Sequence, residues 1–442
     1  MGLTIQHGCP QCGASIEMDE TDRLVRCPFC GIKSLLYSHD YFRYILPDKS
    51  PGKELIYAPY LRFKGNVYFC KNITLDHRII DITHLGFEFT GIPISLGVRP
   101  QAMKLKFVTP EQKGTFLKFS LKTTDILLQA AKLSSGNSIG TPNEKKVVLD
   151  NALIHYSFSI NSTILSDSDL DEKGAVLHRA FIGETMSIIY LPVYLEGKRL
   201  MDGILNRPIC TLPQGQDDLE PLIIKNPGWG PKFVSTLCPN CGGSMDGERD
   251  SVVLLCKNCH SAWELIEGNW KRLDFSVAGG RDTGTLYIPF WRITAGVKGV
   301  EIETFSDFAR LTNQPMVVGE EKGKKEMKFY SPAFKLRPNF FLNLARQFTI
   351  LQRDFTGDEV FGEKDMFPVT LPETEAIQAL KVILASSAVN KKSIFPNLPK
   401  INFNVKGITL VYIPFVEGPN EMIHEDTGIA INRASLEFGR RM

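Results

Sequence analysis

Eight of the ten cysteines in this chain of 442 residues form two groups with the same internal spacing. Each group follows the pattern Cys-x2-Cys-x14-Cys-x2-Cys; the members are Cys9, Cys12, Cys27 and Cys30 in the first group and Cys238, Cys241, Cys256 and Cys259 in the second. A Cys-x2-Cys pair brings two thiolates together on one tight turn, and two facing turns supply the four sulfur ligands of a tetrahedral metal site. The spacing therefore predicts two metal sites, and we expect zinc as the cofactor, two ions per chain.

Residues that favour tight turns flank these cysteines. The sequences Cys9-Pro-Gln-Cys-Gly, Cys27-Pro-Phe-Cys-Gly and Cys238-Pro-Asn-Cys-Gly place proline inside the turn and glycine directly after it. Glycine suits that position because it adopts positive φ at little cost. The fourth turn, Cys256-Lys-Asn-Cys-His, departs from the pattern. Strand-like segments lie between the two turns of each group, so we expect each group to fold as a hairpin that brings its turns together.

Both groups resemble zinc ribbons, also called rubredoxin-like modules, over about thirty-five residues each. The resemblance implies a four-cysteine metal site and says little about activity. A module this short buries little core, so its metal-binding energy, roughly 10–16 kcal/mol in comparable peptides, becomes folding energy. A structural role for both metal sites is therefore the expectation.

Three other assignments remain open for the same residues. Four thiolates in this arrangement can hold a one-electron iron centre of the rubredoxin type. The sequence Cys256-Lys-Asn-Cys-His also spells the C-x-x-C-H motif of c-type haem attachment, although both of its cysteines already belong to the second group. A disulfide framework is the third assignment, and the paired spacing in a long chain without a secretion signal argues against it.

Other motifs that could carry chemistry are incomplete. Residues 136–140 match the nucleophile pattern G-x-S-x-G, but a helical stretch precedes them where a strand is required. Residues 167–171 begin like a calcium loop, but Glu172 stands where the loop needs glycine. The sequence contains no phosphate-binding glycine loop, dinucleotide fingerprint or His-Glu-x-x-His. We therefore expect no catalytic residue and no further cofactor, and we expect Cys70 and Cys210 to be buried small hydrophobic side chains.

The chain repeats more than its cysteines. The second cysteine group follows the first at one constant offset, the distance from Cys9 to Cys238, and shorter matches follow in the same order in both halves. The segment starting at Tyr57, Tyr-Ala-Pro-Tyr-Leu-Arg, matches Tyr-Ile-Pro-Phe-Trp-Arg from Tyr287, and the Tyr-Leu-Pro at Tyr190 matches the Tyr-Ile-Pro at Tyr412. We therefore predict a tandem duplication, and we expect the two Tyr-x-Pro segments of each half to lie side by side in one sheet.

The predicted fold class is α+β, in which each half is a zinc ribbon followed by a mixed α/β body with an antiparallel-rich sheet. Apolar residues at steps of three and four predict helices at 301–311, 339–352 and 373–388. The predicted order is a ribbon at 1–36, a body at 50–215, a linker at 216–235, a second ribbon at 236–270 and a second body at 284–442.

Composition narrows the functional classes. Lys and Arg number 51 against 49 Asp and Glu, and a net charge of +2 gives no field that would attract polyanions. No apolar run approaches the roughly eighteen residues that span a bilayer, and the N-terminus lacks a signal-peptide pattern. We expect a cytoplasmic protein with no membrane span.

The leading functional hypothesis is a non-enzymatic interaction or scaffold protein with a protein partner. Ribbons also occur in nucleic-acid-binding machines, but binding would favour basic and aromatic hairpin tips. The tips are instead acidic: Asp19, Glu20 and Asp22 in the first ribbon, and Asp246, Glu248 and Asp250 in the second. Electron transfer through thiolate-bound iron is the third hypothesis.

Overall fold

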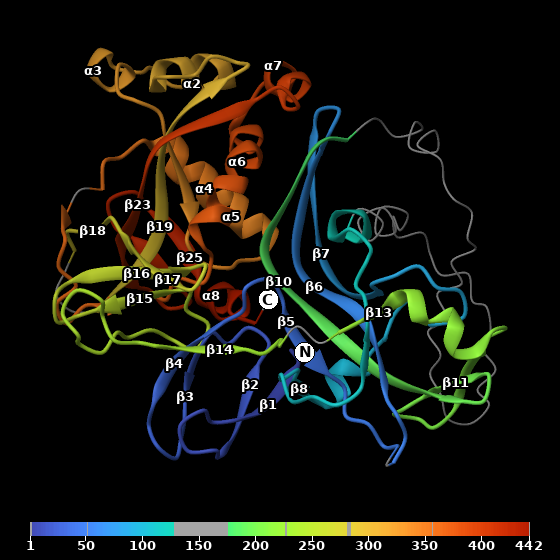
Figure 1. Cartoon of the computed structure of the whole chain (residues 1–442). Coiled ribbons are helices and arrows are strands. Elements are labelled where there is room, and N and C mark those ends of the chain that lie inside the picture. Colours follow the sequence, from blue (N-terminus) through green and yellow to red (C-terminus); the bar gives the residue numbers. More distant parts are fainter. Residues whose placement is uncertain are drawn as a thin grey trace.

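The computed structural model describes residues 2–50, 52–127, 176–225, 228–280, 284–355 and 357–441. The motifs at 136–140 and 167–171 lie outside the described residues. The first half, blue to green in Figure 1, and the second half, yellow-green to red, form two lobes with the cysteine-rich segments at their base. Strands predominate over helices in both lobes, which confirms a mixed fold with antiparallel-rich sheets.

Two long antiparallel strands organise the first half. They are β6 (Ile56–Lys71) and β10 (Val176–Glu196). The short strand β5 (Phe42–Ile45) runs parallel to β10, and β9 (Thr115–Leu117) runs parallel to β6. The remaining strands of this sheet are β1 (Thr4–Gly8), β2 (Ser15–Asp19), β7 (Thr74–Leu85), β8 (Lys104–Phe107), β11 (Arg199–Asp202), β12 (Pro208–Thr211) and β13 (Ile223–Ile224).

The second half has a central pair of its own. Strands β19 (Thr285–Lys298) and β23 (Asn402–Glu417) pair antiparallel. Here β18 (Phe275–Ala278) runs parallel to β23, and β22 (Asp365–Met366) runs parallel to β19. The other strands of this sheet are β20 (Lys328–Pro332), β21 (Gly357–Asp358), β24 (Glu421–His424) and β25 (Ile429–Asn432).

The Tyr-x-Pro segments pair in the same register in both sheets. Each tyrosine lies opposite the proline of the other segment: Tyr57 faces Pro192 and Tyr190 faces Pro59 in the first sheet, and Tyr287 faces Pro414 and Tyr412 faces Pro289 in the second. All four tyrosines are buried. The expectation that these segments lie side by side in one sheet is therefore confirmed.

The helices predicted in the second half are present, with shifted ends. Helix α2 (Phe305–Thr312) begins later than expected because the Thr304 side chain accepts a hydrogen bond from the Asp307 N–H and caps it there. Helix α4 (Pro338–Leu351) starts at its proline, and the third predicted helix is divided at Ala379. The other helices of the second half are α3 (Glu320–Gly323), α5 (Glu373–Gln378), α6 (Leu380–Ser387), α7 (Lys391–Ile394) and α8 (Arg433–Gly439). Short 3-10 turns in the described part of the chain lie at Pro100–Ala102, Gly215–Asp218, Glu220–Leu222 and Phe395–Asn397.

The hydrophobic core of the second half extends into the first. Tyr68 and Cys70 of β6, with Ala180 and Ile182 of β10, are buried in the same cluster as α4 and α6. Figure 1 shows β10 leaning toward α5 across the boundary between the lobes. Burial of a large apolar side chain contributes about 1.5–3 kcal/mol, so these residues hold the two halves together. Cys70 is fully buried as expected, whereas Cys210 is half-buried.

Candidate metal centres

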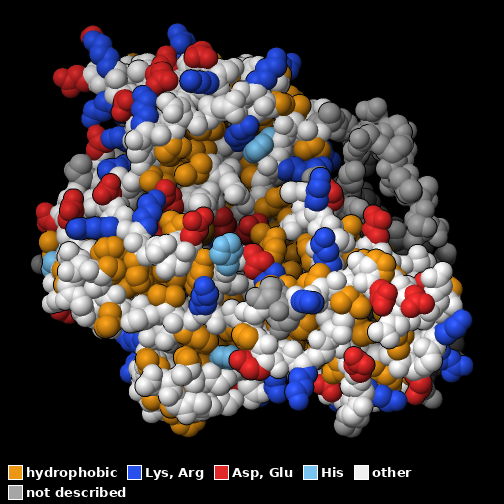
Figure 2. All heavy atoms as spheres, viewed as in Figure 1, with side chains coloured by type: hydrophobic (Ala, Val, Ile, Leu, Met, Phe, Trp, Pro, Cys, Tyr) orange, Lys and Arg blue, Asp and Glu red, His pale blue; other side chains and the backbone are white. Residues whose placement is uncertain are grey.

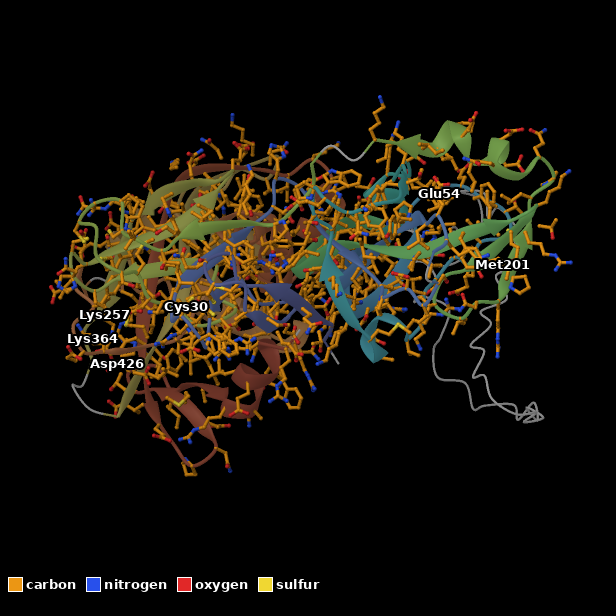
Figure 3. All side chains as sticks on the ribbon, turned by 60° about the horizontal axis from the view of Figure 1, so that its bottom comes forward. Cys30, Glu54, Met201, Lys257, Lys364 and Asp426 are labelled. Atoms are coloured by element: carbon orange, nitrogen blue, oxygen red, sulfur yellow. The ribbon has the colours of Figure 1, made fainter. Side chains whose placement is uncertain are left out.

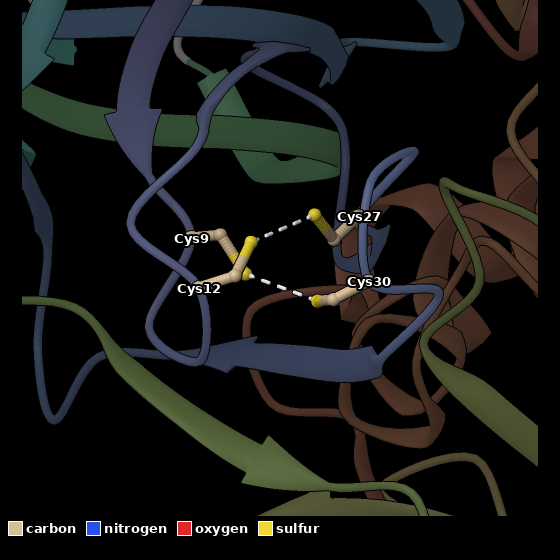
Figure 4. A group of neighbouring side chains, drawn as sticks. All are labelled: Cys9, Cys12, Cys27 and Cys30. Carbon is tan, nitrogen blue, oxygen red and sulfur yellow. Dashed lines mark hydrogen bonds between the residues drawn. The ribbon is translucent and has the colours of Figure 1, made fainter.

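The first cysteine group forms a compact cluster of four sulfurs. Cys9 follows β1, and Cys27 follows β3 (Leu24–Arg26). Cys9 Sγ lies 3.7 Å from Cys30 Sγ, and Cys12 Sγ lies 3.7 Å from Cys27 Sγ (Figure 4). Strand β4 (Lys33–Tyr37) continues the chain from Cys30. In each Cys-x2-Cys turn the first cysteine, Cys9 or Cys27, is buried and the second, Cys12 or Cys30, is exposed.

The second group repeats this geometry. Cys238 Sγ lies 3.6 Å from Cys259 Sγ, and Cys241 Sγ lies 3.5 Å from Cys256 Sγ. The elements that position these sulfurs are β15 (Val253–Cys256), β16 (Ser261–Ile266) and β17 (Asn269–Leu273), which form a three-stranded sheet. The structure therefore brings together all eight cysteines that the sequence predicts as ligands, in the two predicted sets.

The distances suit a metal ion. A tetrahedral zinc–thiolate site, with bonds of about 2.3 Å, has sulfur–sulfur edges of about 3.8 Å. The four sulfurs of each group lie within 4.8 Å of one another, and the nearest pairs are close to the tetrahedral edge. A disulfide would need about 2.05 Å, and all ten cysteines are free thiols. Each cluster thus offers four soft ligands and fits zinc or iron, which share tetrahedral thiolate coordination.

The backbone turns follow the sequence prediction. Gly13, Gly31 and Gly242 have φ of 74°, 73° and 72°, respectively. His260 takes the same left-handed conformation at the fourth turn, with φ of 47°, although for a residue with a side chain this conformation costs about 1 kcal/mol of strain. The His260 imidazole accepts a hydrogen bond from the Phe361 N–H at 3.4 Å. This histidine therefore ties the second ribbon to the body behind it.

Hydrogen bonds to sulfur favour the thiolate form of one cysteine in each cluster. The N–H groups of Cys30 and Phe29 point at Cys27 Sγ and lower the pKa of that thiol to about 6. In the second cluster the side chains of Asn240 and Ser261 lower the pKa of Cys259 to about 6. Thiolates are the metal-binding form of cysteine, so these contacts supply one ready ligand in each cluster.

The two ribbons pack against each other. Leu24 and Leu35 of the first ribbon share a buried cluster with Met245, Leu254 and Trp263 of the second. The Cys30 and Lys257 labels of Figure 3 lie toward the same end of the molecule, whereas Met201 lies at the opposite end. The two cysteine clusters therefore lie in ribbons that pack together as one unit.

The segment 216–235, expected as a linker, contributes one strand to the first ribbon and one to the first body. Strand β14 (Lys232–Ser235) pairs with β4 and becomes the third strand of a sheet in the first ribbon. Strand β13 pairs with β9 of the first body. Polar and glycine-rich composition indicated a connection here, but it gave no signal of these pairings.

The acidic tip of the first ribbon is ion-paired inside the chain. Glu20 makes two contacts to Arg62, at 3.0 Å from Nη2 and 3.2 Å from Nε, and both residues are almost fully buried. Arg62 also pairs with Asp81 on β7, and Asp22 pairs with Arg249 of the second ribbon. An arginine in the middle of an apolar strand was the only sequence signal for this pairing.

The acidic tip of the second ribbon has partners too. Asp250 accepts two hydrogen bonds from Arg440, near the C-terminus, at 2.7 and 2.9 Å. Glu248 lies 3.4 Å from the same guanidinium. Asp246 pairs with Lys33 of the first ribbon. The ion pairs of both tips therefore hold the ribbons to each other and to the bodies.

A buried polar cluster joins the two halves beside these clamps. The bulge in β10 between Ile182 and Thr185 turns the N–H groups of Gly183 and Glu184 toward the Glu375 carboxylate. Lys335 Nζ donates to Thr185 Oγ1 at 2.9 Å. Burial raises the pKa of Glu184 to about 7 and lowers that of Lys335 to about 8.

A groove lies beside the first metal cluster. It has a volume of about 500 Å³, and its lining includes Gln11, Ile32, Phe233 and Leu237. Leu237 is 58% exposed, and Phe29 in the turn between Cys27 and Cys30 is 72% exposed. Figure 2 shows further hydrophobic surface over the lower, ribbon-bearing end of the molecule.

Comparison of the chain with protein-family models, with curated proteins and with solved structures finds no match. Among the residues that the structure describes, no helix combines the length and apolar character needed to cross a membrane.

Proposed function

We propose that this chain is a zinc-dependent, non-enzymatic scaffold and interaction protein, with one zinc ion in each ribbon. The ion pairs at the ribbon tips are the main observation that supports this proposal. Glu20, Asp22, Asp246 and Asp250 all bind cationic side chains of this chain, so both ribbons serve as clamps between its parts. Four protein ligands fill a tetrahedral site and leave no position for a substrate, as in structural zinc sites.

We further propose that the two halves arose by duplication. Their central strand pairs share the tyrosine–proline register described above. In each half a short strand runs parallel to the later long strand, and another runs parallel to the earlier one. The same neighbours in the same order, behind identically spaced cysteines, support a common origin for both halves.

The interaction surface in this proposal is the groove beside the first ribbon, together with the adjacent Phe29. Ile32 and Leu237 in the groove and Phe29 in the nearby turn expose apolar surface, which favours an apolar segment of a protein partner. The ribbon tips are acidic, and their carboxylates form ion pairs with cations of the same chain. No observation therefore favours nucleic-acid binding. The free thiols favour a reducing compartment such as the cytoplasm.

Metal analysis tests the cofactor. The protein is purified without added metal, its metals are quantified, and a visible spectrum is recorded. Two zinc ions per chain and no colour are expected. Iron with thiolate-to-metal absorption would contradict the proposal and indicate a redox protein instead.

Site-specific crosslinking tests the interaction role. A photoreactive amino acid replaces Phe29 in the full-length protein, and the same amino acid replaces Val317, which is fully exposed, as a control. Irradiation in cell extract is expected to give a discrete adduct from position 29 that position 317 does not give. Absence of a discrete adduct, or the same adducts from both positions, would refute a partner at this surface.

A further inference from the structure

The two metal clusters differ in the side chains around their sulfurs. Three equivalent positions, related by the offset from Cys9 to Cys238, carry different residues in the two ribbons. In the second ribbon all three residues are polar and have short side chains. They are Gln11, Phe29 and Ile32 in the first ribbon, and Asn240, Asn258 and Ser261 in the second. Because the cysteine spacing is identical, these substitutions change the surroundings of the sulfurs without changing the ligand set.

In the second ribbon, side chains donate hydrogen bonds to sulfur. Asn258 Nδ2 donates to Cys241 Sγ at 3.3 Å. Ser261 Oγ lies 3.1 Å from Cys259 Sγ and accepts a hydrogen bond from Trp263 Nε1 at 2.8 Å. Since the indole N–H occupies a lone pair of the hydroxyl, the hydroxyl proton is free to point at sulfur.

The first ribbon has no counterpart of these donors. Phe29 and Ile32 carry no polar side-chain atom, and within the described part of the chain no side chain other than cysteine makes a hydrogen bond to its four sulfurs. Cys12 and its counterpart Cys241 are both exposed, but Cys30 is exposed whereas its counterpart Cys259 is half-buried. The first cluster is therefore more accessible at Cys30, and among the described residues its sulfurs accept no hydrogen bond from a side chain other than cysteine.

Hydrogen bonds to a thiolate draw negative charge away from sulfur and orient it toward the metal. A thiolate without them is the better nucleophile, and exposed thiolates are the first to be oxidised. We propose that the first cluster is a redox modification site that reacts with hydroperoxides, while the second cluster remains a permanent structural site. This inference rests on the proposed metal role of both clusters.

The reaction takes two electrons from two sulfurs. An exposed thiolate, of Cys12 or Cys30, attacks the peroxide O–O bond; a sulfenic acid forms and hydroxide leaves. The neighbouring thiolate, of Cys27 or Cys9 at 3.7 Å, then attacks the sulfenic sulfur, forms the disulfide and expels a second hydroxide. Oxidation removes two of the four metal ligands. It also loosens the hairpin that carries Glu20 to Arg62.

The first experiment uses the full-length protein with both clusters loaded with zinc. Hydrogen peroxide is added, released zinc is followed with a chromogenic chelator, and disulfides are located by mass spectrometry after alkylation of the remaining thiols. One zinc equivalent is expected to leave at least about ten times faster than the other, with the early disulfide within 9–30. Equal rates, or an early disulfide within 238–259, would overturn the inference.

Matched exchanges of the surrounding residues test the cause. Phe29→Asn with Ile32→Ser supplies donors to the first cluster at exposed positions, and it is expected to slow the fast phase several-fold. Asn258→Phe with Ser261→Ala removes donors from the second cluster and is expected to accelerate the slow phase. If both exchanges leave the fast and slow phases unchanged, hydrogen bonding to sulfur is not the cause of the difference between the clusters.

These experiments separate the inference from the proposed function. Purified protein without two zinc ions would refute the metal assignment itself. Two zinc ions that leave at the same rate would refute only the redox difference. If one exchange prevents metal binding, the wild-type rates and disulfide positions still decide the outcome.

Discussion

Glu20→Gln should destabilise the protein far more than a matched change on the same hairpin. The substitution keeps size and shape but removes the charge that faces the Arg62 guanidinium, and the side chains of this pair are only 1% and 2% exposed. Removal of one partner of a buried pair costs about 3–5 kcal/mol. Arg62 retains Asp81, whose side chain is 36% exposed, so we expect the lower end of this range, about 3 kcal/mol.

Glu17→Gln is the control. Glu17 of β2 pairs with Lys104 of β8, but these side chains are 49% and 59% exposed. Exposed pairs contribute about 0–1 kcal/mol. In thermal unfolding followed by tryptophan fluorescence, Glu20→Gln should lower the midpoint by about 5–10 °C and Glu17→Gln by less than about 3 °C.

A second substitution refines this test. Arg62→Met, added to Glu20→Gln, removes the buried cation that has lost one of its two carboxylate partners. It should recover part of the lost stability, because apolar replacements of buried ion pairs are often neutral. Equal midpoint shifts for Glu20→Gln and Glu17→Gln would refute the clamp role of the acidic tip. So would a double variant that is less stable by the full sum of both single changes.

The same structure supports four further predictions. A strong zinc chelator should lower the thermal midpoint by about 10 °C or more, because metal binding contributes to ribbon folding, and an unchanged midpoint after verified metal loss would contradict a structural role. Cys241→Ser should reduce the metal content from two ions to one by elemental analysis; retention of two would show that the second cluster is misassigned. Trp263→Ala should lower the free energy of unfolding, measured with denaturant, by about 3–5 kcal/mol. The substitution opens a cavity between the ribbons and leaves the Ser261 hydroxyl without its donor. A loss below about 1 kcal/mol would contradict ribbon–ribbon packing. Burial raises the pKa of Glu184 to about 7, so its contribution to stability is complete below about pH 4.5 and is lost as pH rises through 7. Glu184→Gln should flatten this part of the curve of stability against pH by on the order of 2 kcal/mol. An unaltered curve would contradict the assignment.

The sequence was sufficient to identify the two four-cysteine groups that could hold metal ions, because their geometry is local. A Cys-x2-Cys turn is determined by its own residues, and the constant offset between the two cysteine groups shows that the same solution occurs twice. The paired Tyr-x-Pro segments were predictable for a related reason, since proline restricts where a strand can pair. Helix α4 was readable from its apolar period, whereas the start of α2 depended on a cap formed by Thr304 and Asp307.

The contacts between distant segments were not predictable. No periodicity relates Glu20 to Arg62, or Glu375 to the N–H groups of a bulge in β10. The acidic ribbon tips argued only against nucleic-acid binding, because a single sequence does not show which cation lies opposite each carboxylate. The pairing of β14 with β4 likewise depends on how the whole chain folds back on itself.

That pairing has a consequence for the order of events during synthesis. Strand β4 ends at Tyr37, but β14, which completes its sheet, begins only at Lys232, after the whole of the first body has been made. The apolar partners of Leu24 and Leu35, including Trp263, emerge later still. The first ribbon can therefore collect its metal early, but it must expose an unpaired strand edge and an apolar face until more than half of the chain has left the ribosome. A fragment that ends at residue 215 would keep this exposed edge permanently, so the first half should be prone to aggregation when it is produced alone.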